Sequence, residues 1–277
     1  MSYFHKHYPR INLPISTEDS PRGLRNAQIG AIHAIGAHFS LFENDPALVV
    51  MPTGSGKTAV ITLSGYLLRA KRILVLSSTK LVRSQIVKEF EELLTLKYLN
   101  VFHKELECPK VFEMMGPLKN KKEWNIVSKF DVVVGIPNSV ATSVDNYNPG
   151  PTTFDLILVD EAHHTPAATW EKSIASFPDA KRVYFTATPF RRDGKEVPGR
   201  ITYNYPISRA YKDKIFGEIG FIPVEIKGNQ DKDLAIALQT EKVFKKDRID
   251  GLDHYLLVRT RLKEHANQLE KLYSSKT

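Results

Sequence analysis

A short glycine-rich loop follows an apolar run near the start of the chain and leads into a predicted helix. Residues 48–51 are apolar, and the sequence MPTGSGKT occupies residues 51–58. Gly54 and Gly56 can adopt backbone angles that are closed to other residues, so successive N–H groups can turn toward one anion. The helix that follows adds free N–H donors and a partial positive charge at its start. The loop therefore predicts a cradle for phosphate.

The polar side chains of this loop indicate which kind of phosphate compound it binds. Lys57 adds a full positive charge beside the outer phosphates, and the Thr58 hydroxyl can bind the Mg²⁺ that bridges them. Thr53 and Ser55 complete the loop and are expected to contact the same phosphates. A stricter form of the pattern has glycine where this chain has Met51, a departure that we expect to have little effect. The sequence therefore predicts a site for a nucleoside triphosphate with Mg²⁺.

The composition of the chain is that of an ordinary globular protein. Of its 277 residues, 42% are apolar and 25% are charged, and the apolar runs are too short to cross a membrane. The first residues contain no apolar signal region, and the single cysteine, Cys108, allows no internal disulfide. We therefore expect a cytoplasmic protein without a membrane partner. The formal charge of +8 favours a polyanionic partner, although only weakly.

Apolar runs alternate with helical patterns over most of the chain. Near-continuous apolar strands separated by helices predict an α/β fold, in which a mostly parallel sheet carries helices on both faces as a three-layer sandwich. Ligands of such sheets bind at the carboxyl ends of the strands. The predicted strands are 47–51, 73–77, 132–135, 156–160 and 182–186, with 111–115 as a further candidate. The predicted helices are 25–38, 57–70, 80–95, 137–144 and 167–176.

The alternation of apolar strands and helices weakens beyond about residue 205. Pro223 makes residues 221–226 an edge strand or a linker, since proline cannot donate to a central ladder. A strand over 254–260 and an amphipathic helix over 262–273 predict the opening of a second α/β domain, which the chain barely begins. The predicted organisation is an N-terminal tail (1–21), a nucleotide-binding domain (22–220), a linker (221–252) that includes a charged helix over 231–247, and the start of a second domain (253–277).

Two adjacent carboxylates, Asp160 and Glu161, end the predicted strand 156–160. A site for Mg²⁺ and a triphosphate needs a carboxylate near the metal, usually through water, and a base that orients the attacking water. Asp160 suits the first role and Glu161 the second. Thr186 and Thr188 end another strand on a short turn, which by itself indicates only a turn with a helix cap.

Taken together, these motifs resemble those of the superfamily 2 helicases. The loop at 51–58, the Asp-Glu-Ala-His sequence at 160–163 and the Thr-Ala-Thr-Pro sequence at 186–189 are similar to motifs I, II and III of that family. The continuation of the third motif through Arg191, with Asp193, most resembles the branch of restriction-enzyme translocase subunits and DEAH-type DNA helicases. The resemblance implies that residues 22–220 form a RecA-like P-loop domain.

The resemblance also implies roles for individual residues. Arg25 and Gln28 match the element that selects adenine. Lys57, Asp160 and Glu161 match the catalytic residues, and Thr58 and Asp160 match the Mg²⁺ site. His163, Thr186 and Thr188 match the residues that couple hydrolysis to nucleic-acid binding. The positions that match the nucleic-acid side are Thr79, Lys80, Pro137, Asn138 and Ser139.

The function that the resemblance implies is ATP hydrolysis that drives movement on, or unwinding of, nucleic acid, with DNA favoured over RNA. The setting could be a restriction or phage-defence system. In this family the arginine fingers come from a second RecA-like domain, in the same polypeptide or in another subunit, so we expect the present chain to bind ATP and to hydrolyse it weakly. The alternatives are a nucleotide-dependent switch or scaffold and, less compatible with the second and third motifs, a phosphate-loop kinase or metabolic transferase.

Overall fold

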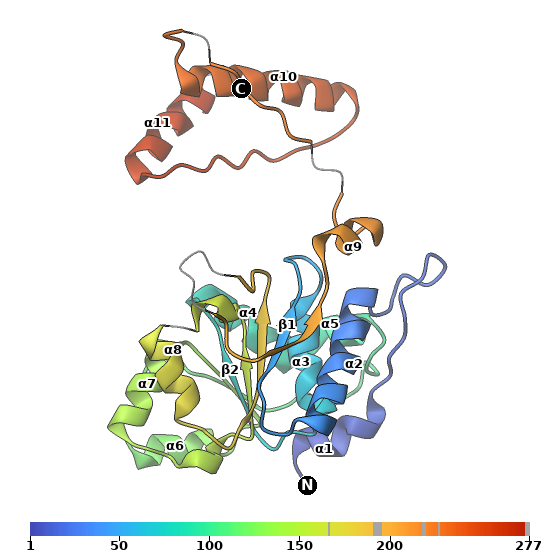
Figure 1. Cartoon of the computed structure of the whole chain (residues 1–277), viewed down its shortest axis with the longest axis vertical. Helices are drawn as coiled ribbons and strands as arrows, with labels where there is room; N and C mark the ends of the chain where they lie inside the picture. Colours follow the sequence, from blue (N-terminus) through green and yellow to red (C-terminus); the bar gives the residue numbers. More distant parts are fainter. Residues whose placement is uncertain (166, 191–195, 218–219, 227, 275–277) are drawn as a thin grey trace. The chain divides into compact units, whose positions relative to one another are not determined.

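The computed structural model describes residues 1–165, 167–190, 196–217, 220–226 and 228–274. The chain divides into two compact units, Met1–Gly217 and Glu218–Thr277. The first contains the sheet and most of the helices, and the described part of the second contains two helices (Figure 1). No described helix is long and apolar enough to cross a membrane.

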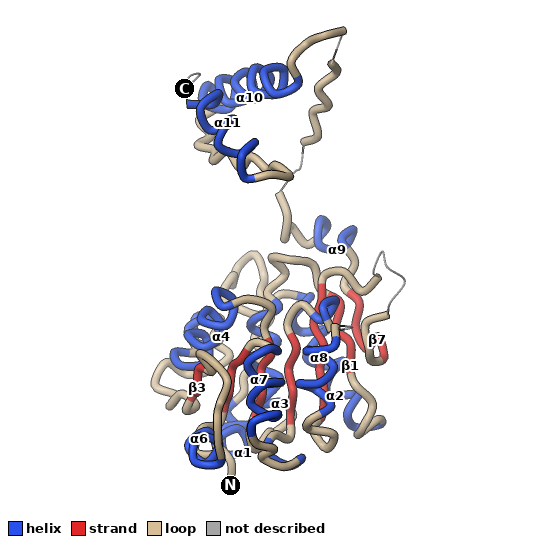
Figure 2. Tube along the Cα trace, turned by 90° about the vertical axis from the view of Figure 1, so that its left-hand side faces the viewer, coloured by secondary structure: helices blue, strands red, loops and turns tan. Residues whose placement is uncertain are grey.

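A seven-stranded sheet forms the centre of the first unit (Figure 2). The strand order is β3-β4-β2-β5-β6-β1-β7, and every pairing in it is parallel. The strands are β1 (Ala47–Val50), β2 (Ile73–Leu76), β3 (Val111–Glu113), β4 (Val132–Gly135), β5 (Leu156–Val159), β6 (Lys181–Thr186) and β7 (Arg200–Asn204). The predicted α/β class and parallel sheet are thus confirmed.

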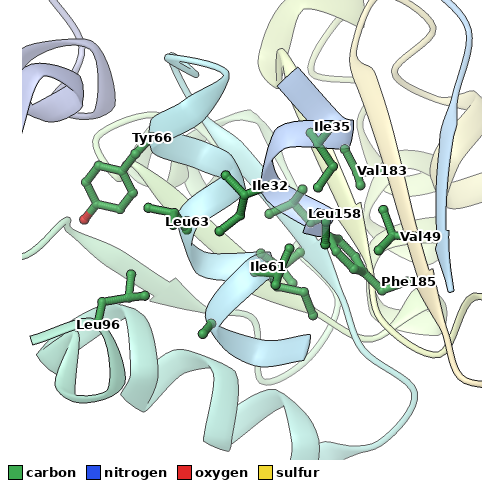
Figure 3. Close-up of a cluster of buried hydrophobic side chains, with 14 of the residues drawn as sticks. Ile32, Ile35, Val49, Ile61, Leu63, Tyr66, Leu96, Leu158, Val183 and Phe185 are labelled. Carbon is green, nitrogen blue, oxygen red and sulfur yellow. The ribbon is translucent and has the colours of Figure 1, made fainter. Parts of the chain in front are cut away.

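The sheet is covered by helices on both faces because successive strand residues point to opposite sides. Val49 packs in a core with the helices α2 (Asn26–Leu41), α3 (Lys57–Leu67), α4 (Lys80–Glu92) and α5 (Leu94–Tyr98). Its neighbours Leu48 and Val50 pack in a second core with α6 (Lys121–Val127), α7 (Pro137–Asn146) and α8 (Ala168–Ala175). Figure 3 shows the first core, where side chains of α2 and α3 meet those of β1, β5 and β6.

The first residues of the chain, expected to form a tail, lie in the same compact unit as the sheet. They form α1 (Tyr3–His7) and the 3-10 turn η1 (Tyr8–Arg10). Phe4 is fully buried, and its ring lies 4.8 Å from that of Tyr66 in α3. An aromatic side chain buried in this way contributes several kcal/mol of packing, so this segment is part of the core.

Strand β7 was not predicted from the sequence. It pairs in parallel with β1 at the edge of the sheet, with a register shift between Leu48 and Val49. Its residues are exposed or half-buried throughout, so it lacks the apolar run that marks a central strand. It leads into the short helix α9 (Ile207–Lys212). The described residues of the unit also form the 3-10 turns η2 (Pro151–Thr153) and η3 (Ala162–His164).

The second unit contains α10 (Lys232–Ile249) and α11 (Lys263–Ser274). His265 Nε2 of α11 lies 2.7 Å from Asp233 Oδ2 of α10. Both helices were predicted within two residues of their ends. The stretch 221–252, expected to be a linker, belongs to this unit and supplies its longer helix.

The strand predicted over 254–260 is absent, since residues 252–260 have no regular secondary structure. The described residues of the other candidate, 221–226, also form no strand. Tyr255 and Leu257 are 97% and 94% exposed. The prediction was wrong because an apolar run forms a strand only where a neighbouring strand completes its backbone hydrogen bonds.

Candidate nucleotide site

The glycine-rich loop connects the buried strand β1 to α3, as predicted. Gly54 and Gly56 have φ angles of 82° and 90°, in the left-handed region that favours glycine, and Gly56 caps the helix that begins at Lys57. Ser55 is fully buried, and both its hydroxyl and its N–H donate to the Pro52 carbonyl, at 2.6 and 3.2 Å. The Ser55 side chain therefore closes the loop on itself instead of facing outward.

Arg25 and Gln28, at the start of α2, hold the loop from one flank. Arg25 Nη1 donates to the Gly54 carbonyl at 2.9 Å. Gln28 accepts from the Arg25 N–H at 2.8 Å through Oε1 and donates to the Gly56 carbonyl at 3.3 Å through Nε2. The two residues predicted to select adenine thus lie at the loop, and both make hydrogen bonds to its backbone.

The loop and the two carboxylates lie close together at the carboxyl ends of parallel strands. They follow β1 and β5, which are separated in the sheet only by β6. Lys57 Nζ lies 3.2 Å from Glu161 Oε1. Glu161 has a φ angle of 53°, a left-handed conformation that is uncommon for a residue with a side chain, and its N–H donates to Asp160 Oδ1 at 3.0 Å. A strained backbone at the end of β5 therefore accompanies the placement of this carboxylate beside Lys57.

Asp160, like Glu161, is half-buried. Burial raises the pKa of its carboxyl above the ordinary value, the nearby ammonium of Lys57 lowers it, and the negative charge of Glu161 raises it again. The net direction is upward. A carboxylate that is destabilised in this way gains from a cation beside it, which agrees with its predicted role near a metal ion.

His163 and Thr186 connect the carboxylates to the end of β6. His163 Nδ1 lies 3.3 Å from Glu161 Oε2 and 3.3 Å from Thr186 Oγ1. Thr186 is fully buried, and its hydroxyl oxygen accepts from the Thr188 N–H at 3.0 Å. The three residues predicted to couple the site to nucleic acid therefore form one continuous line of contacts that begins at Glu161.

The five residues predicted to lie on the nucleic-acid side come from the carboxyl ends of β2 and β4, which are neighbours in the sheet. Thr79 caps α4 by accepting from the Val82 N–H, and Thr79 and Lys80 are exposed. Asn138 is also exposed, whereas the side chains of Pro137 and Ser139 are buried. Of the five, the side chains of Thr79, Lys80 and Asn138 are accessible to a partner.

The groups at the loop suit a nucleotide with a divalent cation. The loop offers two glycines with positive φ, a helix N-terminus, and the exposed residues Thr53, Gly54 and Thr58. Lys57 supplies the positive charge that phosphate requires. Mg²⁺ is usually held by one or two protein oxygens together with waters and substrate phosphates, a role for which Thr58 and Asp160 have the right chemistry.

Sequence reasoning missed residues that follow β7. A Cβ built on Gly54 would lie 3.8 Å from Cε1 of Phe216. Asp213 accepts from Asn26 Nδ2 at 2.9 Å and from the Tyr205 hydroxyl. No spacing rule links these residues to the loop, since the contact exists only in the folded chain. Two residues of the helicase resemblance, Arg191 and Asp193, lie outside the described residues.

A comparison with family models agrees with this geometry. The model of the family described as "Type III restriction enzyme, res subunit" matches residues 22–191, which is more than half of the chain. The chain belongs to this family. The resemblance inferred from the motifs is thereby confirmed, and the matched range contains the loop, both carboxylates and the turn at Thr186.

Individual relatives of this chain are distant and longer. "Putative helicase 22" of Sulfolobus islandicus filamentous virus (isolate Iceland/Hveragerdi) is 25% identical over 207 residues, which cover 72% of this chain and 35% of the viral protein. A "51.5 kDa protein" of Lactococcus phage (isolate 7-9) is 44% identical over 52 residues, 19% of this chain and 11% of that protein. The chain thus spans about a third or less of the length of the curated relatives that it matches.

One of the solved structures that share the fold comes from a restriction-modification enzyme. It is a nuclease-deletion mutant of the Type ISP restriction-modification enzyme LlaGI in complex with a DNA substrate mimic. The similarity has a TM-score of 0.50 at 18% sequence identity, and it covers 91% of this chain and 24% of that one. At this level of identity the similarity concerns the fold alone.

Proposed function

We propose that this chain is the ATP-hydrolysing part of a translocase or helicase that moves along DNA or unwinds it, within a restriction or phage-defence system. Membership in the res-subunit family supports this function. The name of the viral relative includes the word helicase, and the LlaGI structure contains a DNA substrate mimic. A net charge of +8 agrees with a nucleic-acid partner.

The observation that carries the proposal is the meeting of Lys57 and Glu161. Their side chains are 104 positions apart in the chain and lie 3.2 Å apart at the end of the sheet. A lysine that could neutralise the phosphates and a carboxylate that could act on water thus share one small region, beside a loop with the backbone geometry of an anion site.

When bound, Mg–ATP would supply the phosphoanhydride bond whose hydrolysis releases free energy. The loop N–H groups and Lys57 would hold the phosphates, and Thr58 and Asp160 would hold the cation. Glu161 would accept a hydrogen bond from the attacking water and place it for the reaction. Since Lys57 pairs with Glu161 in the structure, the lysine must exchange this carboxylate for phosphate before Glu161 can act on water.

Coupling to nucleic acid would pass through His163 and Thr186. His163 contacts the Glu161 carboxylate, and a shift of this carboxylate would therefore alter the contact with Thr186 at the end of β6. Thr79, Lys80 and Asn138, at the same edge of the sheet, would contact the nucleic-acid backbone. We further propose that a second RecA-like domain, in the same polypeptide or in another subunit, supplies arginines to the nucleotide.

The experiment is a measurement of Mg-dependent ATP hydrolysis without nucleic acid, with duplex DNA, with single-stranded DNA and with RNA. We expect stimulation by DNA that weakens steeply as salt is raised. Lys57→Ala should weaken ATP binding, whereas Glu161→Gln should bind ATP and turn over at a small fraction of the parental rate. Lys71→Ala and Glu105→Gln are the matched controls, since both residues are exposed. Each control should bind and hydrolyse ATP as the parent does.

Two results would contradict the proposal. If Lys57→Ala and Glu161→Gln both bound and hydrolysed ATP as the parent does, the site assignment would be wrong. If the parent bound ATP and no nucleic acid changed its hydrolysis, the chain would be a nucleotide-dependent switch or scaffold instead of a motor part.

A further inference from the structure

We propose that Phe216 is the residue on which the base of the bound nucleotide stacks, and that Asp213 holds the segment that carries it. This inference rests on the proposed nucleotide site and adds a contact outside the sequence motifs. Phe216 follows β7 and α9, in the same compact unit as the loop.

Phe216 lies against Gly54 of the glycine-rich loop. A Cβ built on Gly54 would lie 3.8 Å from Cε1 of Phe216, which is ordinary van der Waals contact. Arg25 also contacts Gly54, since its Nη1 donates to the Gly54 carbonyl. The ring and the guanidinium therefore both adjoin the outer part of the phosphate loop, where Gly54 is exposed.

An anchored segment carries the ring. Asp213, whose side chain is 15% exposed, pairs with Arg209 Nε at 3.0 Å and accepts from Asn26 Nδ2 at 2.9 Å and from the Tyr205 hydroxyl. Asn26 is the first residue of α2 and directly follows Arg25. The Asp213 carboxylate thus ties the segment after β7 to the helix start that carries both loop-binding side chains.

The chemistry of the ring indicates its ligand. Phe216 has no polar atom to offer to phosphate or metal, yet it is only half-buried and lies beside residues that do. The heterocyclic base is the flat part of a nucleotide, and its π face stacks on aromatic side chains. Tyr211 contacts Phe216 in an edge arrangement, with ring centroids 5.6 Å apart, which restrains the ring on one side. A restrained aromatic ring beside a phosphate loop is suited to stacking on a base.

The experiment compares the binding of two probes, Mg–ADP and Mg–tripolyphosphate, by calorimetry. Phe216→Leu keeps an apolar side chain against Gly54 and removes the aromatic face. We expect it to weaken ADP binding about tenfold, in the range that base–aromatic stacking contributes, and to leave tripolyphosphate binding unchanged. Phe216→Tyr should bind both probes as the parent does. Urea unfolding of both variants checks that the fold is kept.

A spectroscopic variant gives a second signal. In Phe216→Trp, we expect ADP to quench part of the tryptophan emission, whereas tripolyphosphate should not. The parent, with Trp124 and Trp170 alone, provides the baseline.

The outcomes separate this inference from the proposed function. If Phe216→Leu weakened the binding of ADP and of tripolyphosphate equally, the ring would only shape the loop. If the variant bound ADP as the parent does, the ring would not contact the base. Either result would overturn the inference and leave the proposed nucleotide site intact. A parent that binds neither probe would overturn the inference together with the proposed site.

Discussion

The side-chain amide of Gln28 and the backbone of Gly56 pack so closely that no Cβ fits between them. Gln28 Nε2 donates to the Gly56 carbonyl at 3.3 Å, and a Cβ on Gly56 would lie 2.3 Å from the same nitrogen. Gly56 also has a φ angle of 90°. The glycine therefore serves both the conformation of the loop and the contact with α2.

Gly56→Ala should destabilise the protein by about 2 kcal/mol, because it combines a left-handed backbone with a steric clash. It should also weaken nucleotide binding, since Gln28 must move away from the loop. Urea unfolding and ADP titration measure the two effects. Gly116→Ala is the matched control, since a Cβ at Gly116 meets nothing within 4 Å. Equal unfolding midpoints for the two variants would contradict the role assigned to Gly56.

His163→Ala should separate hydrolysis from its stimulation by DNA. The imidazole contacts both Glu161 and Thr186, so its removal breaks the line of contacts between the carboxylates and β6. We expect ATP binding to be kept and stimulation by DNA to fall about fivefold or more, which is the size of an ordinary coupling energy. His33→Ala, which removes an exposed histidine of α2, should have no effect.

Thr186→Ala should have the same effect as His163→Ala, and the double variant should be no worse than either single variant. Residues that act through one shared contact give such non-additive changes. Fully additive losses in DNA stimulation would show that the two residues act independently.

Asp160→Asn should stabilise the nucleotide-free protein at neutral pH while it abolishes Mg-dependent nucleotide binding. Burial raises the pKa of Asp160 in the folded protein above the pKa that the residue has in the unfolded chain. Ionisation of this carboxyl therefore destabilises the fold once the pH rises above the pKa of the unfolded chain. Asparagine carries no such charge and can still accept from the Glu161 N–H. The advantage of the variant should therefore be present at pH 7 and should vanish below about pH 4, near the ordinary pKa of aspartate. Urea unfolding at several pH values tests this, and an advantage that grows toward low pH would refute it.

Phe4→Ala should destabilise the protein by about 3 kcal/mol, as expected for the removal of a fully buried aromatic side chain. The ring of Phe4 packs on Tyr66, and a Cβ on Gly65 would lie 3.1 Å from it. Tyr8→Ala, at a residue that is 41% exposed, should cost less than 1 kcal/mol. Thermal or urea unfolding of both variants would show whether the first residues belong to the core, and equal stability of Phe4→Ala and the parent would mean that they do not.

The central strands could be predicted because they are buried on both faces. The apolar run at Leu156–Val159 has no polar alternation, and neither has the run at Val132–Val134. Strand β7 escaped prediction because an edge strand is half-exposed and carries Arg200 and Asn204 at its ends. The run at 254–260 misled prediction for the opposite reason, since an apolar pattern shows where a strand could form but not whether another strand pairs with it.

The sequence by itself determined the conformation of the glycine-rich loop, because Gly54 and Gly56 set local backbone angles and Lys57 follows them at the start of a helix. The tertiary structure alone decided which distant side chains meet there. Lys57 reaches Glu161 because β6 alone separates their strands, and Phe216 reaches Gly54 because Asp213 ties its segment to Asn26. The physical reason is that backbone conformation depends on neighbouring residues, whereas a contact across 104 positions depends on the order of the strands in the folded sheet.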